Sequence, residues 1–142
     1  MSAKLNPYLM FDGNAKEAME FYQSVLGGEL TMHNYGDAAP SPETKDKIMH
    51  ANLDNGELYF MASDDCLPDN ELLVGNNIHM SLVGTDEEKL TEYFNKLSEG
   101  GEVNLALNKQ PWGDIYGQFT DKFGIHWMVN ISARHEDQKD TE

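Results

Sequence analysis

The stretch FYQSVLGGEL at residues 21–30 is repeated in pattern by FNKLSEGGEV at residues 94–103. In both stretches the end of an amphipathic segment is followed by Gly-Gly-Glu and then by an apolar run. Glycine is a common helix stop because it adopts the left-handed conformation without strain. The tripeptide alone would therefore be weak evidence, but the same order of elements surrounds both copies, and this order indicates an internal repeat.

Each copy reads as a strand, a helix and three further strands. Apolar residues recur at helical or alternating spacing between breaks rich in Gly, Pro and Asn. The first copy has expected strands at 5–11, 29–35, 48–53 and 58–62 and a helix at 15–26, with a loop at 36–47. After a linker at 64–77, the second copy has expected strands at 78–83, 102–107, 116–120 and 125–131 and a helix at 86–98.

The expected fold class is α+β, built from two βαβββ modules at residues 5–63 and 78–131. The two Gly-Gly pairs lie 73 residues apart (100 minus 27), which sets Asn6 against His79 and Tyr8 against Ser81. In the last hairpins, aligning Gly56 with Gly124 gives 68 (124 minus 56). We expect residues 1–131 to form a single domain and residues 132–142 to form a flexible polar tail.

Alternation along the strands predicts one face under the helix and one open face in each module. The residues expected under the helices are Leu5, Pro7, Leu9, Phe11, Ile78, Met80, Leu82, Trp127 and Val129. The residues expected on the open faces are Asn6, Tyr8, Met10, His79, Ser81, Val83, His126, Met128 and Asn130. Such a mixture of polar, aromatic and sulfur-containing side chains is more typical of a binding pocket than of a dry core.

The charge and the cysteine count exclude several classes of partner. The formal net charge is -15, from 25 Asp and Glu against 10 Lys and Arg, and a nucleic acid or an anionic membrane would be repelled. Cys66 is the only cysteine, so no intrachain disulfide can form. No stretch has the length and apolarity of a membrane span or a secretory signal. We expect a cytoplasmic protein.

Three separated segments resemble one known family. These are PYLMFDGNAKEAMEFY, DKIMHANLDNGELYFMAS and PWGDIYGQFTDKFGIHWMVN. They are similar to the PhnB-like branch of the vicinal oxygen chelate superfamily, which also contains glyoxalase I and bleomycin-resistance proteins, and the likeness covers residues 5–131. The resemblance implies that the two modules curl into a curved half-barrel sheet around a central cavity. It also implies a homodimer, with modules that pair either within one chain or across the dimer.

The resemblance also implies where a metal would be held. Metal-dependent members take His, Glu or Gln ligands from the first and last strands of each module, and these positions map onto Asn6, Phe60, His79 and Met128. Of these four, only His79 is an ordinary ligand for a divalent cation. We therefore expect no metal cofactor. A divalent metal held by His50 and His79 is the alternative, although a stable zinc site needs at least three protein ligands.

The side chains expected to line the ligand-binding cavity combine hydrogen-bonding and aromatic groups. They are Asn6, Tyr8, His50, Phe60, His79, Ser81, Trp112, Gln118 and Met128. Trp112 either closes over a ligand or covers the edge of the core. His79 is the candidate general base, because an imidazole titrates near neutral pH. No other catalytic residue is indicated.

Three functions are compatible with these patterns. The first is a PhnB-like protein that binds a small molecule without the usual metal. The second is a lyase, isomerase or transferase of glyoxalase type that uses either a metal or a histidine base, so enzymatic activity stays open. The third is an interaction domain whose mixed face contacts another subunit. Some relatives carry a ubiquinone-pathway methyltransferase label, but no glycine-rich turn leads from a strand into a helix, and Gly27-Gly28 follows one.

Overall fold

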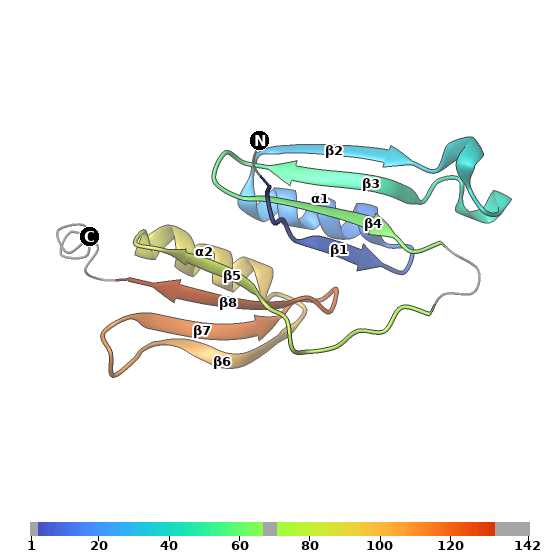
Figure 1. Ribbon diagram of the computed structural model, residues 1–142. Coiled ribbons are helices and arrows are strands. Elements are labelled where there is room, and N and C mark those ends of the chain that lie inside the picture. The colour runs from blue at the N-terminus through green and yellow to red at the C-terminus, as the bar shows by residue number, and fades with distance from the viewer. Residues whose placement is uncertain (1–2, 67–70, 133–142) are drawn as a thin grey trace. The chain divides into compact units, whose positions relative to one another are not determined.

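The computed structural model describes residues 3–66 and 71–132. The chain divides into two compact units, residues 1–73 and residues 74–142. Each unit contains one four-stranded sheet and one α-helix (Figure 1). The predicted tail at 132–142 lies outside the described residues except for Ser132.

The first module follows the predicted order of elements. Its strands are β1 (Tyr8–Phe11), β2 (Glu29–Asn34), β3 (Ile48–Asp54) and β4 (Tyr59–Asp64), and its helix is α1 (Ala15–Leu26). The predicted loop between β2 and β3 holds two short 3-10 helices, η1 (Gly36–Ala38) and η2 (Pro42–Thr44). The helix bounds agree with the prediction because the buried residues recur at helical spacing up to Leu26, where glycine follows.

The second module repeats the first. Its strands are β5 (Met80–Gly84), β6 (Glu102–Lys109), β7 (Ile115–Thr120) and β8 (His126–Ile131), and its helix is α2 (Glu87–Leu97). Asp86 caps this helix, since its side chain accepts a hydrogen bond from the Lys89 amide at 3.1 Å. This agrees with the expected start of the helix.

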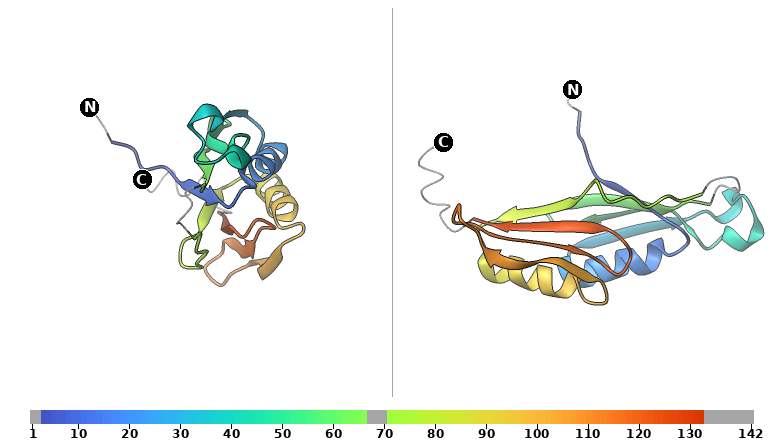
Figure 2. Two further views of the ribbon diagram at one scale, coloured as in Figure 1. Left: turned by 90° about the vertical axis from the view of Figure 1, so that its right-hand side faces the viewer. Right: turned by 90° about the horizontal axis from the view of Figure 1, so that it is seen from below.

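Both sheets have the same topology. The strand orders are β1-β4-β3-β2 and β5-β8-β7-β6. In each sheet the first and last strands of the module pair in parallel, and all other neighbours are antiparallel. The helix covers one face of its own sheet, as the further views show (Figure 2). The duplicated α+β βαβββ fold is therefore confirmed.

The core of each module lies between the helix and one face of the sheet. In the first module Met19 and Tyr22 of α1 pack there with Leu53 of β3, all fully buried. In the second module Phe119 and Trp127 are buried, and their rings stack with centroids 6.2 Å apart. The side chains on the opposite face of each sheet form what we call the open face, and they are half-buried or exposed at most positions.

A left-handed backbone explains the glycines at 27, 28 and 100, and close packing against the hairpin turn explains those at 28 and 101. Gly27 and Gly100 stop the helices with φ of +76° and +78°, a region that favours glycine. At Gly28 a Cβ atom would lie 2.6 Å from the Asn55 backbone, and at Gly101 it would lie 2.1 Å from the Thr120 carbonyl oxygen. The second glycine thus lets the chain pass close to the hairpin turn of its own module.

The hairpin turns explain an error in the predicted register. The turn between β3 and β4 contains residues 55–58, whereas the turn between β7 and β8 contains residues 121–125, which is one residue more. Gly56 precedes the start of β4 by three residues and Gly124 precedes the start of β8 by two, so aligning the turn glycines shifts β4 against β8 by one position. Tyr8 pairs with Met61 and Ser81 pairs with Met128, so Met61 is the equivalent of Met128.

Phe60 therefore lies on the wrong face for the predicted cavity. It is 3% exposed and packs edge-on against Tyr22 of α1, with ring centroids 5.7 Å apart. Alternation then places its neighbour Met61 on the open face beside Tyr8. Phe60 is a core residue, and its assignment to the ligand-binding face was wrong.

The first strand of each module starts later than predicted. Leu5 is 99% exposed and Ile78 is 80% exposed, so neither packs under a helix as expected. Only Leu82 and Phe11 of the predicted apolar sets on these strands are fully buried. Pro7 precedes β1 directly and offers no amide proton to extend the sheet.

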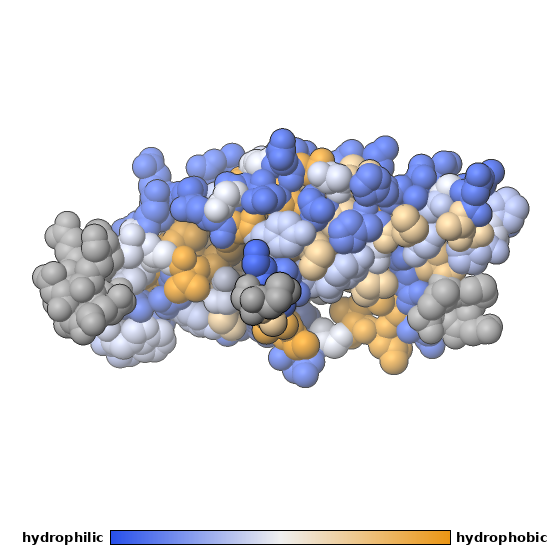
Figure 3. Space-filling view, turned by 45° about the horizontal axis from the view of Figure 1, so that its top comes forward, coloured by the Kyte–Doolittle hydropathy of each residue, from blue (hydrophilic) through white to orange (hydrophobic). Residues whose placement is uncertain are grey.

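The surface seen in Figure 3 is mostly hydrophilic, with hydrophobic residues in small separate groups. This agrees with the excess of acidic over basic residues. Among the described residues, no helix has the length and apolarity needed to cross a membrane.

Candidate functional site

The open face of the first module joins β1 to β3 through one polar contact. The Tyr8 hydroxyl lies 3.1 Å from Nδ1 of His50, and the two rings are tilted with centroids 5.7 Å apart. Tyr8 is 43% exposed, and His50 is half-buried. The structure thus brings together two of the predicted cavity residues, in an orientation that leaves part of the tyrosine ring uncovered.

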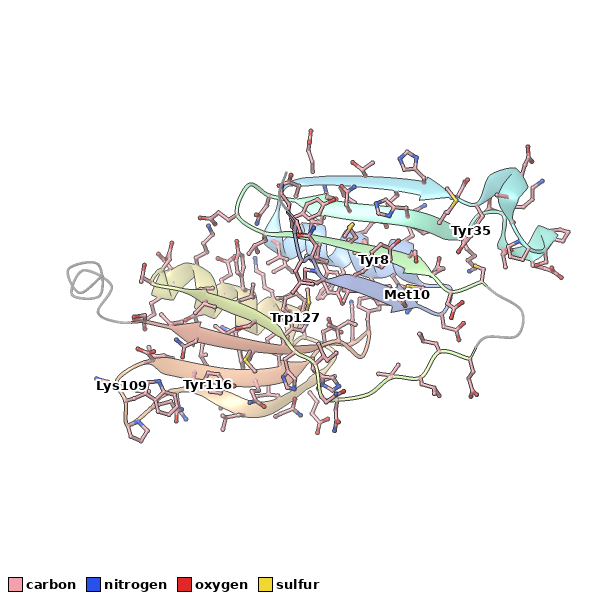
Figure 4. All side chains as sticks on the ribbon, in the orientation of Figure 1. Tyr8, Met10, Tyr35, Lys109, Tyr116 and Trp127 are labelled. Atoms are coloured by element: carbon pink, nitrogen blue, oxygen red, sulfur yellow. The ribbon has the colours of Figure 1, made fainter. Side chains whose placement is uncertain are left out.

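A serine and a methionine form a second contact on this face. Ser63 pairs with Met10 across the β1–β4 ladder, and its hydroxyl donates to the Met10 Sδ at 3.4 Å. Ser63 is 5% exposed, whereas Met10 is 42% exposed, so the thioether covers the hydroxyl. A thioether is a weak acceptor. Figure 4 labels Tyr8 and Met10 on the same strand.

In the second module the open face carries a chain of three side chains. Gln118 Nε2 donates to the Tyr116 hydroxyl at 2.8 Å, and this hydroxyl donates to the Met128 Sδ at 3.7 Å. All three residues are half-buried, and they lie on the adjacent strands β7 and β8. Gln118 and Met128 were predicted to line the cavity. Because Gln118 donates to the Tyr116 oxygen, the Tyr116 hydroxyl donates its own hydrogen bond to the Met128 sulfur.

The turn between β6 and β7 adds an aromatic ring and a carboxylate. Trp112 is 62% exposed and tilts against Tyr116, with ring centroids 6.4 Å apart. The Asp114 carboxylate accepts from Nδ2 of Asn130 at 3.0 Å. Of the two roles expected for Trp112, covering the edge of the core does not fit a side chain that is this exposed.

His79 and His126 lie together near the start of β5 and β8. Their rings stack with centroids 5.5 Å apart and planes at 29°. His126 Nε2 lies 3.0 Å from the Gly75 carbonyl oxygen, and His126 Nδ1 lies 2.9 Å from Oγ1 of Thr120. Because a carbonyl only accepts, His126 Nε2 carries a proton in this contact. Both nitrogens of His126 are therefore engaged.

His79 differs from His126 in the hydrogen bonding of its ring, because only one of its two nitrogens has a partner among the described residues. Nε2 lies 3.3 Å from the Asn76 carbonyl oxygen, which makes Nε2 the donor. In the neutral ring Nδ1 then keeps its lone pair, and within the described part of the chain this buried atom has no hydrogen-bond partner. His79 thus presents the group that a general base requires, although the atom is enclosed.

The remaining predicted residues lie at the margins of these clusters. Asn6 is half-buried and precedes β1 by two residues. Ser81 is exposed on β5, opposite Met128. His50 belongs to the first module and His79 to the second, and no group of three or more His, Cys, Asp or Glu side chains that could hold a metal occurs within residues 3–66 and 71–132.

Ser63, Met61, Tyr116 and Asp114 are among the residues that escaped the sequence analysis as site residues. Met61 was displaced from the prediction by the one-residue difference between the hairpin turns. Tyr116 shares its face with Gln118, so strand alternation alone could have included it. Asp114 precedes β7, and no sequence pattern signals its contact with Asn130.

Basic residues are almost absent from the strands. Of all the residues in β1 to β8, only Lys109, the last residue of β6, is a Lys or Arg. The Ser63 and Tyr116 hydroxyls and the Gln118 amide are neutral donors, and Lys109 pairs with Ile115, so strand alternation places its side chain on the face away from Tyr116. Such a face offers hydrogen bonds and sulfur or aromatic contacts, not charge pairing.

Cys66 lies two residues after the end of β4, apart from these clusters, and the pKa of its thiol is shifted. Burial, and then the nearby Asp64 carboxylate, raise the pKa of the Cys66 thiol. Burial is also the main cause that raises the pKa of Tyr35, whose hydroxyl donates to the Asp64 carbonyl oxygen at 2.9 Å. A raised thiol pKa lowers the thiolate fraction at neutral pH, which makes Cys66 a poor nucleophile.

The chain matches the family model of the Glyoxalase/Bleomycin resistance protein/Dioxygenase superfamily over residues 4–129. It belongs to this superfamily.

Two similar proteins match this chain over nearly all of their own length. Protein YjdN of Escherichia coli is 29% identical over 149 residues, which cover 94% of this chain and 99% of YjdN. The crystal structure of PA1353 from Pseudomonas aeruginosa is 41% identical with a TM-score of 0.82, covering 92% of this chain and 98% of that one.

A third similar structure is described as a PhnB protein. A Bacillus cereus structure described as "Putative 3-demethylubiquinone-9 3-methyltransferase, PhnB protein" is 26% identical with a TM-score of 0.76. The match covers 92% of this chain and all of that chain.

Proposed function

We propose that this chain is a PhnB-like protein that binds a small molecule on the open faces of its sheets, without the metal site of glyoxalases. The chain Gln118–Tyr116–Met128 is the observation that carries the proposal. It orients a hydroxyl proton in a half-buried position against a weak acceptor. A face built only for packing would not need such an orientation, and polar groups set among apolar ones are what small-molecule sites use for recognition.

The donor set does not fit a hard divalent cation. With the corrected register, the positions at which metal-dependent relatives hold ligands are Asn6, Met61, His79 and Met128. Two of the four are thioethers, which suit soft ions and not zinc, nickel or manganese. We derive no catalytic step through a metal.

Purified protein tests this proposal directly. The protein should be prepared from cells without added chelator and analysed by native mass spectrometry and by elemental analysis for zinc, nickel and manganese. We expect less than about one tenth of a metal ion per chain, and a bound small molecule whose occupancy falls when Tyr116 is replaced by Phe. Stoichiometric metal together with lyase, isomerase or thiol-transfer activity would contradict the proposal.

A histidine-base enzyme is a second candidate, and the buried lone pair of His79 favours it. In such an enzyme Nδ1 would take a proton from the substrate while the Asn76 carbonyl oxygen holds Nε2–H. His79→Ala should then abolish turnover. His126→Ala is the matched control, since both nitrogens of His126 are occupied. Full turnover in His79→Ala would exclude this candidate.

The resemblance to PhnB-like proteins also supports a cytoplasmic homodimer. Twice the chain mass in light scattering at micromolar concentration is the expected result, and the mass of a single chain would contradict it. The enclosure of one cavity by the two modules stays a prediction. The methyltransferase description of the Bacillus relative does not extend to this chain on present grounds, since the sequence lacks a glycine-rich turn from a strand into a helix.

A further inference from the structure

In each module a hydroxyl group donates a hydrogen bond to a methionine sulfur. In the first module Ser63 donates to Met10 at 3.4 Å, and in the second Tyr116 donates to Met128 at 3.7 Å. A thioether accepts hydrogen bonds far less well than a carbonyl oxygen. Ser63 is buried and Tyr116 is half-buried, so each hydroxyl spends its proton on a poor acceptor in a position with limited access to water.

The direction of these bonds restricts the chemistry of a ligand. Gln118 donates to the Tyr116 oxygen at 2.8 Å and thereby directs the hydroxyl proton away from itself. A ligand that meets this hydroxyl gains most if it brings an acceptor. An ammonium or guanidinium group would bring a second donor to a hydroxyl whose own proton needs an acceptor.

Charge argues against an anionic acceptor. Only Lys109, at the end of an edge strand, is basic among all the strand residues, and the whole chain carries a net charge of -15. Lys109 pairs with Ile115 and not with Tyr116, so strand alternation directs its side chain to the other face of the sheet, and a carboxylate or phosphate beside Tyr116 would lose water without gaining this counter-ion. A neutral acceptor such as a ketone, aldehyde or amide carbonyl has no such penalty.

The surroundings of Tyr116 favour a flat apolar body next to that carbonyl. The Trp112 ring is 62% exposed and lies at 6.4 Å from the Tyr116 ring, so a planar ligand can stack on it. Methionine is flexible and makes favourable contacts with aromatic rings, so Met128 can move aside and still contact the ligand. Figure 4 shows Tyr116 labelled on β7.

We infer that the second module binds a neutral, planar ligand with a carbonyl oxygen, which accepts the Tyr116 proton in place of Met128 Sδ and stacks on Trp112. This inference rests on the proposed small-molecule function and specifies the ligand class. Tyr116 then selects the carbonyl group of the ligand, and Trp112 binds the planar ring of the ligand.

Three matched probes test the inference on the full chain. They are 1-acetonaphthone, 1-naphthoate and 1-naphthylmethylammonium, which share a ring system and differ in head group and charge. Quenching of the exposed Trp112 reports binding, because Trp127 is 1% exposed and contributes a constant background. We expect 1-acetonaphthone to bind at least about tenfold more tightly than either ion.

Two variants separate the roles of the side chains. Tyr116→Phe should weaken 1-acetonaphthone by about two- to tenfold, the range of one hydrogen bond, and leave the ions unchanged. Met128→Leu conserves volume and removes the competing acceptor, so ketone binding should be unchanged or stronger. Tyr93→Phe makes the same chemical change at a residue buried on α2 and should bind all probes like the native chain.

The outcomes distinguish this inference from the proposed function. Tighter binding of 1-naphthoate or of the ammonium probe overturns the ligand class, and so does a Tyr116→Phe chain with unchanged ketone affinity. Failure of all three probes to bind also overturns it. In each case a small molecule found on the purified protein by native mass spectrometry would leave the proposed function standing, and its absence would remove both.

Discussion

Asp64 shows how one buried carboxylate holds the first module together. It is 1% exposed, and it accepts backbone N–H groups of Gly13 at 3.0 Å, Ala15 at 2.9 Å and Ile48 at 2.8 Å. These donors belong to the start of α1 and the start of β3. A single side chain at the end of β4 therefore fixes both the entry of the helix and the return of the chain to the sheet.

Asp64→Asn should destabilise the protein by about 2–4 kcal/mol, because an amide N–H₂ group would face backbone donors and charge-assisted bonds would be lost. Urea denaturation measures the change. Asp54→Asn is the control, since exposed Asp54 accepts one backbone amide, that of Gly56 at 3.0 Å, and we expect a loss below about 1 kcal/mol. Equal losses in the two variants would refute this account of Asp64.

At the scale of elements, the hairpin turns determine which side chains face the ligand. The turn of residues 121–125 is one residue longer than the turn of residues 55–58, and a one-residue shift moves a whole strand to its other face. Phe60, which was predicted to face the ligand, is therefore a core residue, and Met61 takes its place on the open face.

The observed register predicts a larger loss of stability for a substitution at Phe60 than for one at Met61. Phe60→Ala should cost about 3–5 kcal/mol, because it opens a cavity against Tyr22. Met61→Ala should cost less than about 1.5 kcal/mol, since its side chain is only half-buried on the open face. Thermal and urea unfolding of both variants check the order, and a larger loss for Met61→Ala would restore the original register.

The Gly-Gly pair gives a second prediction at this scale. Gly27→Ala should cost about 1–2 kcal/mol, because φ is +76° and the space around a Cβ is open. Gly28→Ala should cost roughly 1–3 kcal/mol more, since its Cβ would lie 2.6 Å from the Asn55 backbone. Chemical denaturation of the two variants decides, and similar losses would show that close approach to the turn is unimportant.

The repeat and the helices were predictable because they depend on local periodicity and on helix stops. The one-residue slip at Phe60 was not, because a glycine marks a turn without stating its length. The partners of Tyr116 and Asp114 depend on side-chain directions across strands, which periodicity does not encode. Strand alternation nevertheless placed Tyr8, Ser81 and Met128 correctly on the open faces.

For the whole molecule, the acidic charge should oppose the compact state. With 25 acidic and 10 basic residues, repulsion is only partly balanced, and dissolved salt screens it. Raising sodium chloride from about 20 mM to about 500 mM should increase the melting temperature by about 2–5 °C, equivalent to roughly 1 kcal/mol. Sucrose at matched osmolality is the control. A melting temperature that falls with salt would mean that ion pairs dominate.

The methionines that accept the two hydroxyl protons also make the open faces sensitive to peroxide. Oxidation of a thioether by hydrogen peroxide yields a sulfoxide and water, and the new S=O oxygen is a strong acceptor. A sulfoxide at Met128 would hold the Tyr116 proton within the protein, and one at the 42% exposed Met10 would hold that of Ser63. Peroxide should therefore weaken binding of 1-acetonaphthone by about two- to tenfold, the range of one hydrogen bond, and methionine sulfoxide reductase should restore it. Calorimetry on the Met128→Leu chain, which should keep its affinity after the same treatment, provides the check. The protein would then hold its ligand less tightly under oxidative stress and regain its affinity enzymatically.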